Sequence, residues 1–102
     1  MQRTFFVGDI HGCAHTFKKM VEETLQLTSE DVLYCVGDYI DRGPRSKEVV
    51  DYILNLKQHN YQIHTLRGNH EQMLLDARLG GSAHMLWMMN GGENTLRSFG
   101  SS

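Results

Sequence analysis

The stretch VLYCVGDYIDRG at residues 32–43 places a polar, glycine-flanked segment directly after a continuous apolar run. An apolar run of this length is typical of a β-strand that is covered on both faces, as in a parallel sheet. The same arrangement occurs at residues 4–12, and a related one at residues 61–71, where the strand pattern alternates polar Gln62 and His64 with Ile63 and Thr65. Each polar segment carries carboxylate, imidazole or amide groups, which are ligands for divalent cations. The sequence therefore predicts three strands that deliver metal-binding groups at their carboxyl ends.

Helical periodicity fills the segments between the expected strands, which span residues 4–7, 32–36 and 61–66. Apolar side chains recur at spacings of three and four from about residue 14 to 27, and a second helix is expected from an N-cap at Ser46 to about residue 57. Further helices are expected at about residues 71–79, 83–89 and 93–99. This order predicts an α/β fold, a βαβαβ unit with a parallel sheet and right-handed crossovers.

Length and composition indicate a single globular domain over residues 1–102. The net charge is −2, without the basic stripe that binding to nucleic-acid backbones requires. No apolar run is long enough to cross a membrane and the N-terminus lacks a signal-peptide pattern, so we expect a cytoplasmic protein. Cys13 and Cys35 form no CxxC pair and are expected to be reduced thiols, with a redox or weak metal-contacting role still open for Cys13.

Four side chains in the polar segments have the chemistry of a two-metal centre. Asp9 and His11 lie two residues apart in a glycine-flanked turn and can converge on one cation. Carboxylate with imidazole favours manganese, iron or zinc over magnesium or calcium. Asp38 supplies a carboxylate that can bridge two ions, and Asn69 offers an amide oxygen to the second. Two cations about 3.5–4 Å apart can hold a bridging hydroxide for attack on a phosphoryl group, so we expect two divalent metal ions and phosphoester hydrolysis.

Three neighbouring residues are expected to assist that chemistry. His70 can give the leaving group its proton, Asp41 can orient that imidazole, and Arg42 can grip phosphate oxygens with its planar fork. Each candidate also has a simpler interpretation: Asp9 as a turn residue, Asn69 as a helix N-cap, and the pair Asp41–Arg42 as a surface ion pair. Because ligands bind at the carboxyl ends of parallel strands, three such ends together favour the metal site.

The segments at residues 8–12, 37–43 and 68–71 resemble the N-terminal motifs of the calcineurin-like metallophosphoesterases. More narrowly, they resemble the phosphoprotein phosphatase branch, which includes the serine/threonine phosphatases. Residues 87–92 are similar to a feature of the bacterial and bacteriophage enzymes of that branch. Without the resemblance, residues 85–89 indicate a core segment or a lid over the site, and residues 90–92 indicate the end of a helix. The resemblance implies a four-layer αββα sandwich, of which the βαβαβ unit is one half.

For the site, the resemblance implies the roles already assigned from the residues. Asp9 and His11 would bind the first metal, Asp38 would bridge, and Asn69 would bind the second. His70, paired with Asp41, would be the general acid, and Arg42 would contact phosphate. The implied reaction is hydrolysis of phosphoserine or phosphothreonine, with phosphotyrosine also open, by direct attack of a metal-bridging hydroxide.

Two alternatives to a protein phosphatase stay open. One is a hydrolase of dinucleoside polyphosphates or small phosphate esters, and the other is a catalytically incomplete metal- or phosphate-binding fragment. A nuclease is less favoured because of the negative net charge. The family would add metal-binding histidines and an arginine, and no candidate follows Asn90. We therefore expect a truncated domain with weak activity or none by itself, an exposed sheet edge or apolar sheet face, and self-association through that surface.

Overall fold

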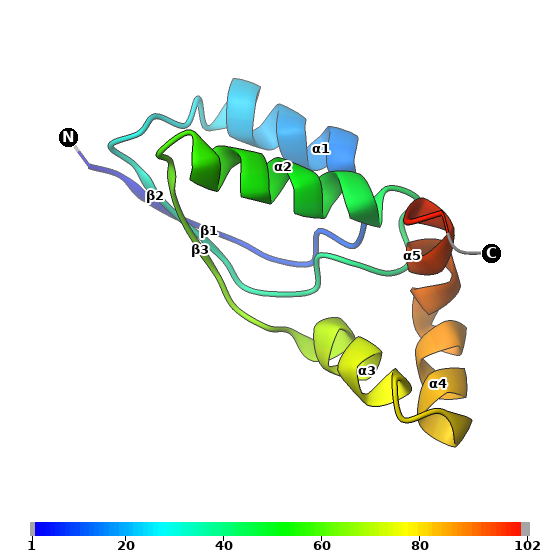
Figure 1. The fold of residues 1–102 in the computed structure, drawn as a ribbon. Helices are drawn as coiled ribbons and strands as arrows, with labels where there is room; N and C mark the ends of the chain where they lie inside the picture. Colours follow the sequence, from blue (N-terminus) through cyan, green and yellow to red (C-terminus); the bar gives the residue numbers. More distant parts are fainter. Residues whose placement is uncertain (1, 101–102) are drawn as a thin grey trace.

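The computed structural model describes residues 2–100, in which three parallel strands form one sheet (Figure 1). The strands are β1 (Thr4–Val7), β2 (Val32–Cys35) and β3 (Gln62–Thr65), in the spatial order β1-β2-β3. In this register Phe6 lies beside Tyr34, and Tyr34 lies beside His64. Because all three strands run in the same direction, their carboxyl ends share one edge. The predicted α/β class and the parallel βαβαβ unit are confirmed.

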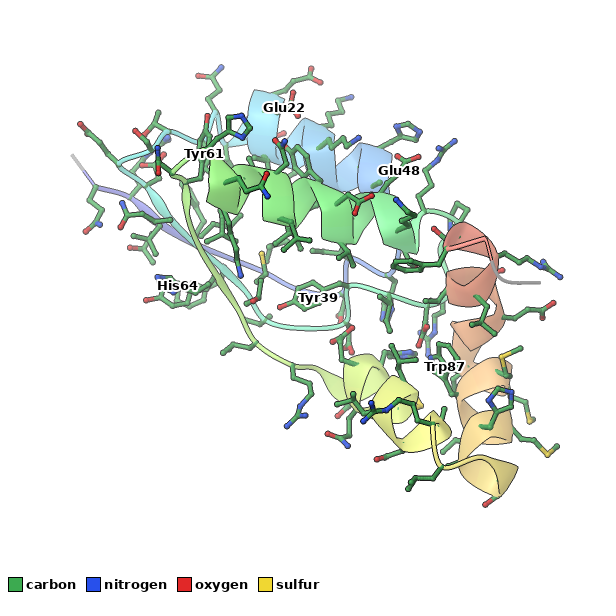
Figure 2. All side chains as sticks on the ribbon, in the orientation of Figure 1. Glu22, Tyr39, Glu48, Tyr61, His64 and Trp87 are labelled. Carbon is green, nitrogen blue, oxygen red and sulfur yellow. The ribbon has the colours of Figure 1, made fainter. Side chains whose placement is uncertain are left out.

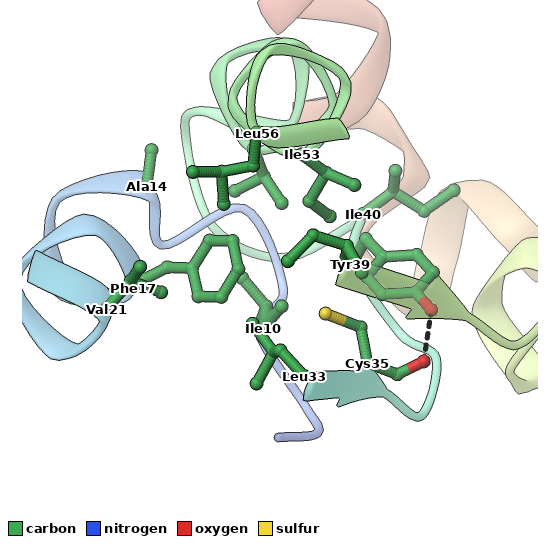
Figure 3. Close-up of a cluster of buried hydrophobic side chains, with 12 residues drawn as sticks. Ile10, Ala14, Phe17, Val21, Leu33, Cys35, Tyr39, Ile40, Ile53 and Leu56 are labelled. Atoms are coloured by element: carbon green, nitrogen blue, oxygen red, sulfur yellow. Dashed lines mark hydrogen bonds between the residues drawn. The ribbon is translucent and has the colours of Figure 1, made fainter. Parts of the chain in front are cut away.

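Two crossover helices cover one face of the sheet (Figure 1). They are α1 (Ala14–Lys19), which continues into the π-helical turn η1 (Met20–Thr24), and α2 (Ser46–Gln58). Their apolar sides pack on side chains from the sheet to form the core (Figure 3). The core includes Ile10, Ala14, Phe17, Val21, Leu33, Cys35, Tyr39, Ile40, Val49, Ile53, Leu56 and Ile63.

The predicted N-cap at Ser46 is wrong. Arg45 occupies the N-cap position of α2, and no side chain caps the helix there. Ser46 is instead the first helical residue and is fully buried. Its hydroxyl accepts the backbone N–H of Asp41 at 3.2 Å, so the serine serves a neighbouring loop rather than its own helix.

The opposite face of the sheet is open over the described residues. Phe6 is 71% exposed, and its ring stacks on Tyr34 with the ring centroids 5.0 Å apart. Tyr34 in turn stacks on His64 at 5.0 Å. Strand β2 itself is largely buried, as predicted, with only Tyr34 half-buried, whereas β1 exposes Phe6, so the predicted exposure of an apolar sheet face is confirmed. An apolar run marks a buried strand but does not reveal which partner covers its second face.

The remaining helices form an arm that returns to the carboxyl edge of the sheet (Figure 1). The arm consists of α3 (Asn69–Ala77), α4 (Gly81–Trp87), the kinked turn η2 (Met88–Gly92) and α5 (Glu93–Ser98). Helix α3 packs against α4, and α5 packs against α2. Asn90 and Gly91 leave helical geometry, so the expected helix stop is found there, and the chain turns into α5. Within residues 2–100, none of the helices has the length and apolar character that crossing a bilayer requires.

Candidate metal centre

The three polar segments meet at the carboxyl edge of the sheet. Backbone hydrogen bonds join the first two: His11 N–H donates to the Asp38 carbonyl at 2.8 Å, and Gly43 N–H donates to the His11 carbonyl at 2.9 Å. This close approach requires glycine, because a Cβ at Gly43 would lie 2.0 Å from the His11 oxygen. Similarly, a Cβ at Gly68 would lie 2.6 Å from the Asp38 nitrogen. The glycines that flank the polar groups thus let three loops touch.

Asp9, His11 and Asp38 present ligand atoms that all lie within 4.8 Å of one another. The Nδ1 of His11 is 2.8 Å from the Ile40 carbonyl oxygen. A carbonyl only accepts, so Nδ1 carries the proton and Nε2 is the ring nitrogen left for a cation. Two carboxylates and one imidazole in such proximity fit a divalent transition metal.

The backbone around these candidate ligands has unusual dihedral angles. Asp9, His11 and Asp38 have φ of 52°, 44° and 57°, and Asp41 and Arg42 have φ of 74° and 67°. The left-handed region costs a residue other than glycine of the order of 1 kcal/mol, and such conformations cluster at functional sites. Here five residues that lie close together all adopt this costly conformation. Such clustering favours a functional site over the simpler interpretation of these residues as ordinary turn residues.

One open cavity of about 800 Å³ collects most of the candidate residues. Its lining residues are Asp9, His11, Asp38, Arg42, Asn69, His70, Gln72, Met73, Asp76, Leu86 and Asn90. Asn69 is the first residue of α3 and follows its N-cap, Gly68, so the interpretation of Asn69 as an N-cap is wrong. The backbone N–H of His70 donates to Asp38 Oδ1 at 2.9 Å, which ties α3 to the second polar segment.

Asp41 lies behind the cavity rather than in its wall. It is fully buried, and its Oδ2 is 2.9 Å from Nδ1 of His70, which is itself only 6% exposed. The ring of His70 meets the ring of His11 edge-on at 4.4 Å. The interpretation of Asp41 and Arg42 as a surface ion pair is therefore wrong, because a buried carboxylate bound to an imidazole is no surface pair. Arg42 stays exposed, and its backbone N–H donates to the Gly91 carbonyl at 3.1 Å.

Three residues to which the sequence assigned no role support this arrangement. Glu71 accepts the backbone N–H groups of Asp38 and Gly68, and Trp87 and Thr95 both donate to the Asp41 carboxylate. Glu71 belongs to a polar segment that the sequence had singled out. Trp87 was expected in the core or a lid, and it is buried, but nothing in the sequence pairs it with Asp41.

Burial also raises the pKa of two ionisable groups in the core, Tyr39 and Cys35. The Tyr39 hydroxyl oxygen lies 2.6 Å from the carbonyl oxygen of Cys35 (Figure 3) and 2.6 Å from that of Leu66. Its single proton can be donated to either carbonyl, and the hydroxyl thereby joins the ends of β2 and β3. Burial raises the pKa of Tyr39 to about 12, so the hydroxyl stays protonated. Burial also raises the pKa of Cys35 to about 11. Cys13 is exposed and its sulfur lies 3.6 Å from the His11 carbonyl oxygen. A redox or metal-contacting role for Cys13 stays a prediction.

A parallel sheet whose strand ends gather carboxylates, an amide and histidines around one cavity forms a candidate divalent-metal site. Residues 2–100 match the family model "Calcineurin-like phosphoesterase". The chain belongs to the calcineurin-like phosphoesterase family.

Among curated relatives, the chain is 44% identical over 92 residues to serine/threonine-protein phosphatase 1 of Salmonella typhimurium, covering 90% of this chain and 40% of that protein. It is 36% identical over 77 residues to a symmetrical bis(5'-nucleosyl)-tetraphosphatase of Buchnera aphidicola, covering 76% of this chain and 27% of that protein. The chain thus spans less than half the length of these relatives.

Solved structures show the same fold. A crystal structure assigned to a diadenosine tetraphosphatase has a TM-score of 0.60 and 27% identity, over 85% of this chain and 40% of that one. A cold-active protein tyrosine phosphatase has a TM-score of 0.62, over 98% of this chain and 33% of that one. Its identity of 19% makes it a guide to the fold alone.

Proposed function

We propose that the protein is a metal-dependent phosphoprotein phosphatase that hydrolyses phosphoserine and phosphothreonine monoesters. The observation that carries this proposal is the grouping of Asp9, His11 and Asp38 in one cavity with His70. The relative at 44% identity, a serine/threonine-protein phosphatase, supports this substrate class. The proposal concerns the whole gene product that carries this chain.

Asp9 and His11 would hold one divalent ion, Asp38 would be shared, and Asn69 would contribute to a second. The mixture of imidazole and carboxylate favours manganese, iron or zinc. When bound, these ions would lower the pKa of water and neutralise charge on the phosphoryl group. His11 is already oriented for this role, because its Nδ1–H is engaged by the Ile40 carbonyl at 2.8 Å.

The remaining candidates would act on the substrate. His70 faces the cavity and bonds the buried Asp41 through Nδ1, so Nε2 is the nitrogen that can protonate the leaving oxygen. Arg42 is exposed on the cavity wall, where its planar guanidinium can donate two hydrogen bonds to phosphate oxygens. Asp41 would keep the imidazole in place rather than contact substrate.

A second candidate function is hydrolysis of a dinucleoside polyphosphate. Several relatives at 34–39% identity are symmetrical bis(5'-nucleosyl)-tetraphosphatases. The cavity of about 800 Å³ is open and its lining includes the apolar side chains of Met73 and Leu86, which suits a base as well as a peptide. The residues that would bind metal and phosphate would act in the same way on both substrates. The two candidate functions therefore differ only in the part of the substrate that surrounds the phosphate.

The test measures hydrolysis of a phosphothreonine peptide, p-nitrophenyl phosphate and diadenosine tetraphosphate by the manganese-loaded gene product. We expect Asp38→Asn to lower kcat/KM at least about 100-fold and His70→Asn about 100- to 10,000-fold on the peptide. Chelation of metal is expected to abolish activity, and manganese to restore it. Asp51→Asn, which changes an exposed carboxylate on α2, is the matched control.

Preferential hydrolysis of diadenosine tetraphosphate would favour the second candidate. No hydrolysis of any ester by metal-loaded protein would refute both. Calorimetric titration with manganese separates these outcomes from failure to bind metal, because it counts the ions held independently of turnover.

A further inference from the structure

The Asp41 carboxylate accepts hydrogen bonds from three side chains that lie far along the chain. Oδ2 accepts the indole N–H of Trp87 at 2.7 Å, and Oδ1 accepts the hydroxyl of Thr95 at 2.5 Å. The third partner is Nδ1 of His70, 2.9 Å from Oδ2. Asp41 is 0% exposed, Trp87 2% and Thr95 4%, so water does not compete for these bonds.

The chemistry of the three partners shows which atom donates the hydrogen in each of these bonds. An indole nitrogen can only donate. The Thr95 oxygen accepts the backbone N–H of Asp41 at 2.7 Å, so its own proton is free to go to Asp41 Oδ1. With the carboxylate serving as acceptor on both oxygens, Nδ1 of His70 carries a hydrogen. Nε2 is then the ring nitrogen that remains for the cavity.

Neither Trp87 nor Thr95 is among the residues that line the cavity. Both reach Asp41 because the chain turns at residues 90–92 and brings α4 and α5 to the carboxyl edge of the sheet. Trp87 lies on the side of this arm that faces the site (Figure 2). The two residues therefore touch Asp41 from behind and cannot contact a substrate that occupies the cavity.

We propose that Trp87 and Thr95 are positioning residues that hold the Asp41 carboxylate in the plane and direction needed to orient His70. This inference rests on the proposed function, in which His70 protonates the leaving group. A charged acceptor held by three donors in a dry environment forms stronger bonds than an exposed one. Loss of one donor would let the carboxylate rotate and would misalign the imidazole without changing the phosphate or metal contacts.

The test compares two phosphate esters that differ in their need for a proton. p-Nitrophenolate leaves readily without one, whereas phenolate is a poorer leaving group and depends more on general acid catalysis. We expect Thr95→Val and Trp87→Phe, which remove a donor while nearly preserving shape, to lower kcat for phenyl phosphate about 10- to 100-fold. The loss for p-nitrophenyl phosphate should be no more than about threefold, and KM should be unchanged for both. Thr95→Ser keeps the hydroxyl and should restore most of the activity on phenyl phosphate.

A spectroscopic measurement checks the contact without relying on turnover. Trp87 is the only tryptophan of the chain, so its indole N–H can be assigned by comparison with Trp87→Phe. Asp41→Asn replaces a charged acceptor with a neutral one and should move that resonance upfield. Leu56→Ala, a change in the core on α2, is the control: it should lower stability yet leave both the resonance and the ratio of the two esters unchanged.

Equal losses on both esters in Thr95→Val and Trp87→Phe would overturn the inference, since a merely structural role predicts that result. An indole resonance that Asp41→Asn leaves in place would overturn it as well. If Trp87→Phe does not fold, the pair Thr95→Val and Thr95→Ser decides the outcome. A metal-loaded wild-type protein inactive on both esters would instead refute the proposed function, and with it any role in proton transfer.

Discussion

Glu71 holds the backbone of Asp38: its Oε1 accepts the Asp38 N–H at 2.6 Å. The same oxygen accepts the N–H of Gly68 at 2.9 Å, and Oε2 accepts that of Tyr39 at 2.9 Å. One carboxylate thus joins the loop after β2 to the first turn of α3. Since Asp38 and Asn69 lie on the two segments that Glu71 ties together, it controls how far apart these candidate ligands sit.

Replacing Glu71 with Gln should weaken metal binding. The side-chain amide of glutamine has only one acceptor oxygen, so its NH2 group would face at least one of these backbone N–H groups, which would lose its hydrogen bond. We expect manganese affinity to fall about 10- to 100-fold, as for other groups that orient ligands, and stability to fall by about 1–3 kcal/mol. Calorimetric titration measures the first and denaturant unfolding the second.

Glu93→Gln is the matched control for this change, because Glu93 is an exposed carboxylate that pairs with Arg97 on α5. It should leave both quantities within error. An affinity unchanged in Glu71→Gln would show that Asp38 keeps its place without the carboxylate.

Adding a methyl group at Gly43 should separate the first two polar segments. The new Cβ would overlap the His11 carbonyl oxygen at 2.0 Å, and that oxygen is backbone, which cannot swing aside. We expect Gly43→Ala to cost about 1–3 kcal/mol of stability, the usual range for overpacking, and to lower manganese affinity by displacing His11. Thermal unfolding with and without manganese measures both effects.

Gly81→Ala separates this clash from backbone strain. Its Cβ would meet nothing within 4 Å, although its φ of +60° is unfavourable for alanine. Stability should fall by about 1–2 kcal/mol while metal affinity is retained. Equal loss of affinity in both variants would contradict the proposed role of the contact between Gly43 and His11.

The ion pair between Arg3 and Asp31 should make stability depend on acid pH. Asp31 is 1% exposed and lies 2.7 Å from the guanidinium of Arg3, whose hydrogen bond holds the pKa of the Asp31 carboxyl well below its usual range. Because this pKa is lower in the folded state, the ionised carboxylate contributes its full stabilisation above the ordinary aspartate pKa of about 3.9. This stabilisation is lost as the pH falls towards the lowered value.

We therefore expect Asp31→Asn to lower the melting temperature by a constant amount between about pH 5 and 7, and by a shrinking amount below about pH 4. Asp51→Asn, in an exposed pair with Lys47, should change stability by less than about 1 kcal/mol throughout. A difference between wild type and Asp31→Asn that grows as the pH falls would have the wrong sign.

The open face of the sheet should drive self-association of the 102-residue chain when it is expressed alone. Phe6 is 71% exposed at the end of the aromatic stack formed with Tyr34 and His64. Burying such a ring is worth about 1.5–3 kcal/mol, so Phe6→Thr should weaken association about tenfold or more in sedimentation equilibrium. Leu54→Thr, which alters a residue 51% exposed on α2, should have little effect. A monomeric wild-type chain at high concentration would contradict this expectation.

Much of the fold and of the candidate site follows from local signals. Apolar runs before Gly8 and Gly37, and an alternating strand pattern shortly before Gly68, marked strand ends, and helical periodicity between them implied parallel strands. Parallel strands bring their carboxyl ends to one edge, so Asp9 and Asp38 had to be neighbours although 29 positions separate them in the chain. The structure places both within one group of ligand atoms.

The sequence by itself thus determined the class of fold and the grouping of the candidate metal-binding side chains, because periodicity and chain direction are properties of short segments. Only the tertiary structure decided what surrounds that group. Trp87 and Thr95 lie 46 and 54 positions from Asp41, and their hydrogen bonds depend on the angle of the turn at residues 90–92, which no local pattern encodes. Ser46 was expected to be a helix cap, but α5 places the Thr95 hydroxyl 3.2 Å from the Ser46 hydroxyl, 49 positions along the chain. Hydrogen bonds between distant residues are set by how helices dock, and docking is a property of the whole chain.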